Sequence, residues 1–200
     1  MAEKQGRLFV VSGPSGAGIG EIMKATIESR EDIGFITPVT ARKMKAGEEN
    51  GKGFFFYDLE GWDALIAEGD LLEHTEFAGN DYGTSRKQVL EQTSHGKNVL
   101  LNLELSRASQ IKENMPESVC VFVIPKDRAV LEERYTATAR NRFEVPIRME
   151  EAEKQVKESS FCDYIVYSDV VEQAVKELSQ IMDAESNTVA SNASLVEELK

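Results

Sequence analysis

"VVSGPSGAGIGEIMKA", residues Val10 to Ala25, joins an apolar stretch to a glycine-rich turn and then to residues at helical spacing. A phosphate-binding loop has this layout and the pattern G-x-x-x-x-G-K-[ST]. The two glycines have the required spacing, but an isoleucine replaces the lysine and a glycine replaces the hydroxyl residue. The flanking strand and helix favour an anion-binding loop over the alternative of a glycine turn without a ligand. The candidate phosphate loop comprises Gly13, Pro14, Ser15, Gly16, Ala17, Gly18, Ile19 and Gly20.

Working outward from this loop, apolar runs typical of strands recur at 98–105, directly before Pro125 and within 162–169, and helical patterns separate them. Runs without polar alternation are typical of strands that are buried on both faces of a parallel sheet. The alternation therefore predicts an α/β fold with a parallel sheet flanked by helices. Asp58 is expected to begin one helix and Gly96 to follow the end of another.

The segment 35–92 departs from this rhythm, because it is richer in glycine and aromatic residues and its strand-like runs alternate apolar with polar residues. We interpret it as an insertion with a small, half-exposed sheet, set into a core made of 6–34 and 93–185. The segment 186–200 has few apolar residues before Leu195, and we expect a flexible tail there.

Composition limits the class of protein. The 200 residues carry a formal net charge of −12, which repels nucleic-acid backbones, so no nucleic-acid partner is expected. No apolar run reaches membrane-spanning length and no signal-like segment opens the chain. Cys120 and Cys162 suggest neither a disulfide framework nor a metal site. We expect a cytoplasmic protein without a membrane partner.

Two further motifs carry candidate binding residues. Arg42 and Lys45 are three residues apart in a loop, where two cations can hold one phosphate. Glu73 lies in a strand-like run before Tyr82 and Thr84, and a carboxylate with nearby hydroxyls can bind a guanine edge and a phosphate. Taken alone, each motif is more simply explained as surface charge or an ordinary hairpin.

In this order and spacing, "SGPSGAG", "TxRxxxxGExxG", "LEHxEFxGNxYGTS" and the later "RM" resemble guanylate kinases. The resemblance extends to about Ala184, and the "LEHTEFAGNDYGTSR" stretch is its most specific part. It implies a P-loop core, a GMP-binding insertion over 35–92 and a mobile lid over 127–147. Members of this family transfer a phosphoryl group from ATP to GMP with Mg²⁺.

The resemblance implies a GMP site that is largely present. Its members are Arg42, Lys45, Phe54, Glu73, Tyr82, Thr84 and Glu104. Lys45 replaces an arginine and loses its planar fork, while Phe54 replaces a tyrosine and Glu104 replaces an aspartate. Pro38 stands where a serine contacts the phosphate in the family, so that hydrogen bond is lost.

The resemblance implies larger losses on the ATP side. Ile19 removes the lysine that reaches the β- and γ-phosphates, and Gly20 removes the hydroxyl that holds Mg²⁺. Asn102 replaces an acidic residue that helps to hold the water shell of the metal. The lid retains Arg134, Arg140 and Arg142, but alanines replace its glycines. Arg148 matches a phosphate-facing arginine of the helix after the lid, and Arg134 and Arg148 are the candidate catalytic residues.

These losses predict a protein that binds GMP or a related guanine nucleotide and transfers phosphate weakly or not at all, as a monomer or homodimer. One alternative is an active guanylate kinase with a variant loop, and only then is Mg²⁺ expected, bound with ATP; otherwise no cofactor or metal is expected. A second alternative is an interaction module that binds a phosphorylated peptide. The retained Glu73 and Thr84 argue against the module, because a peptide binder needs no guanine reader.

Overall fold

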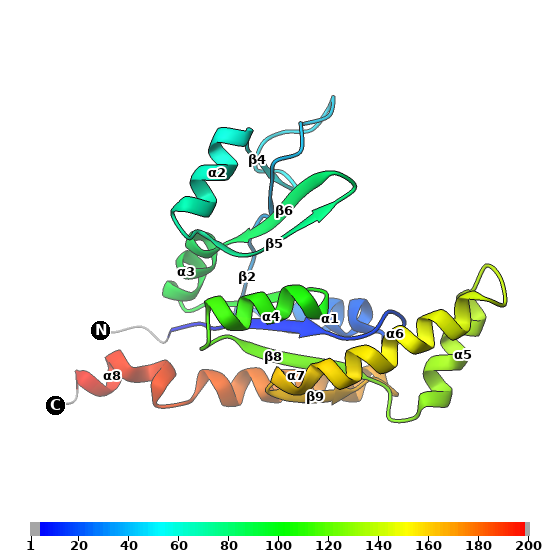
Figure 1. The fold of residues 1–200 in the computed structure, drawn as a ribbon. Helices are drawn as coiled ribbons and strands as arrows, with labels where there is room; N and C mark the ends of the chain where they lie inside the picture. Colours follow the sequence, from blue (N-terminus) through cyan, green and yellow to red (C-terminus); the bar gives the residue numbers. More distant parts are fainter. Residues whose placement is uncertain (1–4, 199–200) are drawn as a thin grey trace.

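The computed structural model describes residues 5–198, without the side chains of 194 and 195; the last two residues of the predicted tail lie outside this range. Its main sheet has five strands in the order β2-β7-β1-β8-β9, and every neighbouring pair is parallel. The predicted parallel α/β sheet is therefore confirmed (Figure 1). The strands are β1 (Leu8–Ser12), β2 (Ile33–Gly34), β7 (Asn98–Asn102), β8 (Val119–Ile124) and β9 (Tyr164–Tyr167).

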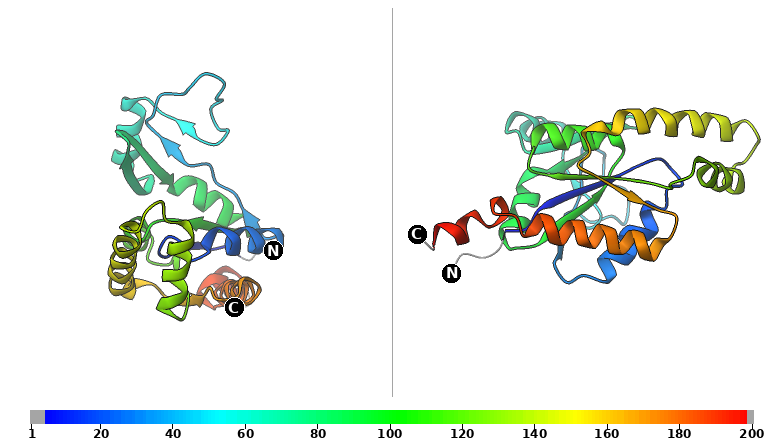
Figure 2. Two further views of the ribbon diagram at one scale, coloured as in Figure 1. Left: turned by 90° about the vertical axis from the view of Figure 1, so that its right-hand side faces the viewer. Right: turned by 90° about the horizontal axis from the view of Figure 1, so that it is seen from below.

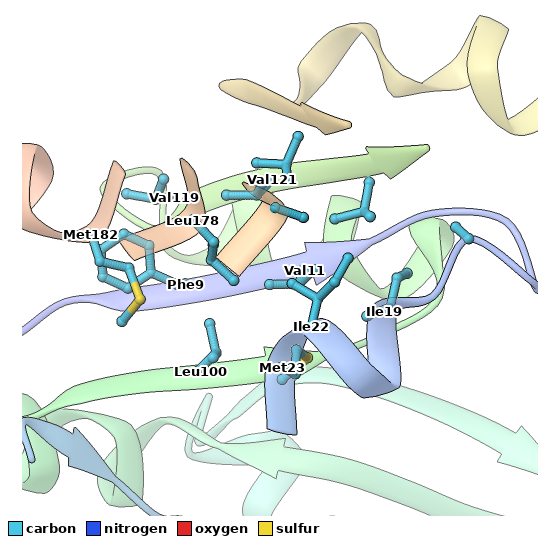
Figure 3. Packing of buried hydrophobic residues seen from close by; sticks show 14 of the residues in the cluster. Phe9, Val11, Ile19, Ile22, Met23, Leu100, Val119, Val121, Leu178 and Met182 are labelled. Atoms are coloured by element: carbon cyan, nitrogen blue, oxygen red, sulfur yellow. The ribbon is translucent and has the colours of Figure 1, made fainter. Parts of the chain in front are cut away.

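Helices cover both faces of the main sheet because successive side chains of its central strand point to opposite sides. Phe9 and Val11 of β1 pack in one cluster with α1 (Ile19–Glu28) and α7 (Val171–Ser186), as Figure 3 shows. Leu8 and Val10 pack in another cluster with α3 (Arg86–Ser94) and α4 (Leu105–Asn114). All five residues of β1 are buried, as the apolar run predicted.

A second sheet lies within the predicted insertion and has the strand order β4-β3-β6-β5. Its strands are β3 (Val39–Thr40), β4 (Phe55–Phe56), β5 (Leu71–Phe77) and β6 (Asn80–Ser85). The helix α2 (Leu59–Ala67) covers it with Trp62 and Leu65, and the Asp58 side chain accepts from the Gly61 N–H at the start of this helix, as expected. In Figure 1 this unit stands to one side of the main sheet.

The helices α5 (Arg128–Thr138) and α6 (Glu144–Glu158) form a hairpin that extends beyond the main sheet, as Figure 1 and the right view of Figure 2 show. Leu131, Tyr135, Met149 and Ala152 pack between the two helices. The hairpin contains the 127–147 segment, and the movement of that segment as a lid stays a prediction.

Three short helices lie in the last part of the chain that the structure describes: η1 (Ser159–Phe161) precedes β9, and η2 (Ala190–Asn192) and α8 (Ala193–Glu197) follow α7. Arg7 joins this end to β1, because its guanidinium donates to Glu185 Oε2 at 2.8 Å and to Ser191 Oγ at 3.0 Å. The expected tail therefore contains two helical turns, and its flexibility stays a prediction.

The two cysteines lie together where β8 and β9 begin. Both are free, with the Sγ atoms 2.8 Å apart. The hydrogen bond to Cys162 and burial raise the pKa of the Cys120 thiol. Within residues 5–198, no helix is long and apolar enough to cross a membrane, and no group of three or more His, Cys, Asp or Glu residues is arranged to hold a metal ion.

Candidate nucleotide-binding site

The glycine loop connects β1 to α1 in a conformation that only glycine adopts readily. Gly13, Gly16 and Gly18 have φ values of +156°, +79° and +85°, and Gly18 is the residue before the first turn of α1. A Cβ atom on Gly13 would lie 2.2 Å from the carbonyl oxygen of Val123. These constraints give a loop whose backbone N–H groups and helix start suit an anion.

A cavity of about 1200 Å³ opens over this loop. The loop forms its floor, the end of β7 one wall, and α5 and α6 another. Among the described residues, the charged side chains that line it are three cations and four carboxylates. They are Arg134, Arg148 and Lys154 against Glu21, Glu104, Glu151 and Glu158. The lining side chains therefore carry one more negative than positive charge.

Both candidate catalytic arginines reach the loop. Arg134 donates to the carbonyl oxygen of Gly16 at 3.1 Å and to that of Ser168 at 2.8 Å. Arg148 donates to Ser15 Oγ at 3.2 Å, and its guanidinium lies 4.0 Å from the centre of the Tyr135 ring. The hairpin of α5 and α6 thus brings two positive charges to the phosphate loop.

Ile19 and Gly20 do not restore what the loop lacks. The Ile19 side chain is only 9% exposed and belongs to the apolar cluster between the sheet and α1 (Figure 3). Gly20 has open space where a Cβ would lie. Lys24, about one turn after Gly20 in α1, does not line the cavity, and its Nζ lies 3.9 Å from Glu28 Oε1. Neither position supplies an anionic ligand for Mg²⁺, because Gly20 has no side-chain oxygen and Asn102 offers only a neutral amide.

A second cavity, of about 470 Å³, lies between the two sheets. Phe54, Tyr82 and Thr84 line it from the insertion, and Glu104 and Arg107 line it from the start of α4. Asn102, Leu103 and Glu104 line both cavities. The two cavities therefore meet at the carboxyl end of β7, where a phosphate donor and an acceptor could face each other.

Arg42 and Lys45 lie outside the residues that line either cavity. Arg42 donates to both carboxylate oxygens of Glu48, at 2.8 and 3.0 Å, and its guanidinium lies 5.8 Å from the centre of the Phe54 ring. The guanidinium and the Lys45 backbone N–H lower the pKa of Glu48 to about 2. The Lys45 side chain is exposed. Glu48 is thus a partner that the sequence analysis did not identify.

Glu73 is fully buried in β5, although its hydrogen-bond partners Thr84 and Arg107 line the second cavity. Thr84 Oγ1 donates to Glu73 Oε1 at 2.6 Å. Arg107 donates from Nε to Oε2 at 2.5 Å and from Nη2 to Oε1 at 2.8 Å. Arg107 is not among the residues that the sequence motifs predict for the site. It follows closely after the apolar run 98–105, and no motif there indicates a contact with Glu73.

The parallel sheet, the glycine loop and the helix that begins at this loop define a P-loop nucleotide-binding protein. The guanylate kinase family model matches residues 5–185. A guanylate kinase of Oceanobacillus iheyensis is 34% identical over 92% of this chain and 90% of its own length, and one of Clostridioides difficile is 35% identical over 95% and 93%.

A solved structure extends this similarity to the fold. The guanylate kinase of Anaplasma phagocytophilum has a TM-score of 0.63 and 26% sequence identity, over 94% of this chain and 89% of that one. The chain belongs to the guanylate kinase family. The resemblance read from the sequence motifs is thereby confirmed.

Proposed function

We propose that this protein binds GMP, or a related guanine nucleotide, in the second cavity and that its transfer of phosphate from ATP is weak or lost. The charge of the phosphate-loop cavity carries this proposal. Ile19 supplies no cation, and Arg134 and Arg148 already donate to protein oxygens. Four carboxylates line the same cavity. ATP would therefore bind without the charge that phosphoryl transfer requires.

The magnitude of the expected loss is large. Phosphoryl transfer depends mainly on positioning and on stabilisation of charge. Removing one well-placed donor costs about 3–4 kcal/mol of barrier, or roughly a thousandfold in rate. This chain lacks the loop lysine and the hydroxyl at the next position, so even a partial penalty leaves a slow enzyme.

For the guanine nucleotide we propose a division of roles. Arg42, Lys45 and Tyr82 hold the phosphate, which requires Arg42 to share or release Glu48. Phe54 packs beside the ligand, and the base is read by Glu73, Thr84 and Glu104, which offer a carboxylate, a hydroxyl and a second carboxylate.

An active guanylate kinase with a variant loop is the second candidate. Its support is Lys154, whose exposed side chain on α6 lines the phosphate-loop cavity beside Arg148. In that case Mg²⁺ would accompany ATP, and Arg134, Arg148 and Lys154 would together replace the loop lysine in stabilising charge.

Two measurements on the purified protein separate the candidates. We expect calorimetry to detect GMP binding and little Mg·ATP binding, with steady-state turnover far below the roughly 1–100 s⁻¹ that is typical of kinases. Turnover within that range would establish the active enzyme instead. Tight ATP binding without GMP binding would overturn the proposal.

A further inference from the structure

The carboxylate expected to read guanine is already bound by an arginine of its own chain. Glu73 lies on β5, and Arg107 lies in the first turn of α4, which packs beside this strand. The guanidinium donates to both carboxylate oxygens, from Nε at 2.5 Å and from Nη2 at 2.8 Å. A two-bond contact of this kind between a planar guanidinium and a carboxylate is among the stronger polar contacts in proteins.

This arginine presents the same donors as a guanine base. Guanine offers N1–H and the N2 amino group side by side on one edge, and Arg107 offers Nε–H and an Nη amino group in the same way. Thr84 and Arg107 together occupy both lone pairs of Oε1, and Arg107 takes one of the two on Oε2. One acceptor position remains, whereas the guanine edge needs two.

The burial of the two side chains also indicates that Arg107 blocks access to the Glu73 carboxylate. The Glu73 side chain is 0% exposed and the Arg107 side chain is 22% exposed. Arg107 and Thr84 line the 470 Å³ cavity, whereas Glu73 does not. Arg107 therefore lies between the cavity and the carboxylate. Glu76 and Glu104 line the same cavity and offer carboxylates to the guanidinium once it moves.

We infer that Arg107 is a specificity-determining residue that competes with the guanine base for Glu73. The base gains both hydrogen bonds only when the guanidinium turns away, so the apparent affinity for GMP is reduced by the fraction of molecules in which Glu73 is free. The same competition reduces the ratio of GMP affinity to AMP affinity. It weakens the binding of GMP alone, because adenine does not use this carboxylate as a pair of acceptors. The inference rests on the proposed guanine-nucleotide site.

The test is calorimetric titration of the full chain with GMP and with AMP, for the wild type, Arg107→Ala and Arg107→Lys. If Arg107 occupies Glu73 in nine molecules of ten, Arg107→Ala should bind GMP about tenfold more tightly, with no gain for AMP. Arg107→Lys keeps the charge with a single donor group and should give an intermediate gain. Lys176→Ala removes an exposed cation on α7, away from both cavities, and should leave GMP affinity unchanged.

Thermal unfolding establishes that each variant is folded before it is titrated, and Arg107→Lys provides the test if Arg107→Ala is not. Equal or weaker GMP binding by the folded Arg107 variants, with binding by the wild type, overturns the competition and leaves the proposed function intact. A failure of every protein to bind GMP overturns both. Equally tighter GMP binding by Lys176→Ala would show that the gain is not specific to Arg107 and also overturns the inference.

Discussion

At the scale of single residues, the phosphate loop depends on backbone freedom at a few positions and on side-chain chemistry at others. Gly16 has a φ of +79°, and a Cβ there would lie 2.8 Å from the Tyr135 ring. Gly20 has ordinary helical backbone and open space around it. The backbone and the packing therefore require glycine at position 16 but not at position 20. Alanine substitutions at the two positions should have opposite effects on stability.

We predict that Gly16→Ala destabilises the protein by about 1–2 kcal/mol, because a left-handed backbone costs that much for an L-residue and the Tyr135 ring must also move. Gly20→Ala should instead stabilise it by up to about 1 kcal/mol, since alanine loses less conformational freedom in a helix. Urea unfolding of both variants measures the difference. Equal effects of the two changes would contradict this account of the loop.

The second prediction at this scale restores the missing chemistry. Ile19→Lys with Gly20→Ser should raise Mg·ATP affinity and GMP phosphorylation, because the amine and the hydroxyl supply the charge and the metal ligand of the loop. The aliphatic part of the lysine can keep some of the packing of Ile19 in the apolar cluster. We expect partial rescue, with a further gain from Asn102→Asp.

The matched control for this rescue is Ile19→Met with Gly20→Ser, which changes the shape without adding the charge. Steady-state turnover of the wild type and of the three variants measures the effect. If turnover rises as much in the methionine variant as in the lysine variant, the missing charge of the loop does not limit the turnover of the wild type.

At the scale of elements, Arg30 connects three parts of the core. It follows α1 and donates to both oxygens of Asp32, at 2.7 and 2.8 Å, and to Asp183 of α7 at 2.8 Å. Asp32 in turn accepts from Asn98 Nδ2 at the start of β7. The hydrogen bond from Arg30 is the main cause that lowers the pKa of Asp32 in the folded protein.

A carboxylate whose folded pKa is depressed stabilises the protein above its unfolded pKa, near 4, and this contribution is lost as the pH falls through the folded pKa. Asp32→Asn should therefore cost up to about 1 kcal/mol at pH 7, since the side chain is 39% exposed and solvent screens the pair. The variant should also lose less stability than the wild type between pH 6 and pH 3.

Urea unfolding at several pH values measures this difference, and Asp183→Asn is the control because Asp183 is 62% exposed and should contribute little. The same loss of stability toward acid in the Asp32→Asn variant and in the wild type would show that Asp32 contributes nothing to this pH dependence.

The elements themselves follow closely from the sequence. The apolar run at β1, the Asp58 start of α2 and the position of Gly96 after α3 are local signals, because each depends on residues within one turn or one strand. Arg107 could not be identified in this way. Its contact with Glu73 joins residues 34 positions apart, and no periodicity or spacing encodes which side chain meets a buried carboxylate.

Arg42 illustrates the same limit. The sequence predicts a cation for a phosphate, and the structure adds Glu48 as the anion that it binds within the loop. Such a partner depends on side-chain geometry in a folded loop, whereas the residue types alone establish only that a charge is available.

At the scale of the whole molecule, the two cavities adjoin at the end of β7, which lines both. The insertion is otherwise a separate sheet with its own apolar cluster around Trp62, and the phosphate loop belongs to the main sheet. A ligand that bridges the insertion and α4 therefore stabilises contacts between the two sheets, while a ligand at the phosphate loop contacts the main sheet and the α5–α6 hairpin.

This arrangement predicts an asymmetry in thermal stability. A ligand that binds only the folded state at 100 times its dissociation constant adds about 2.7 kcal/mol, which corresponds to a rise in Tm of roughly 5–10 °C for a chain of this size. GMP at saturating concentration should approach this value, whereas millimolar Mg·ATP should give little. Hydrogen exchange should locate the GMP effect in β5, β6 and the start of α4. A larger rise with Mg·ATP than with GMP, together with protection of the phosphate loop, would show that the ATP side binds its nucleotide without the lysine.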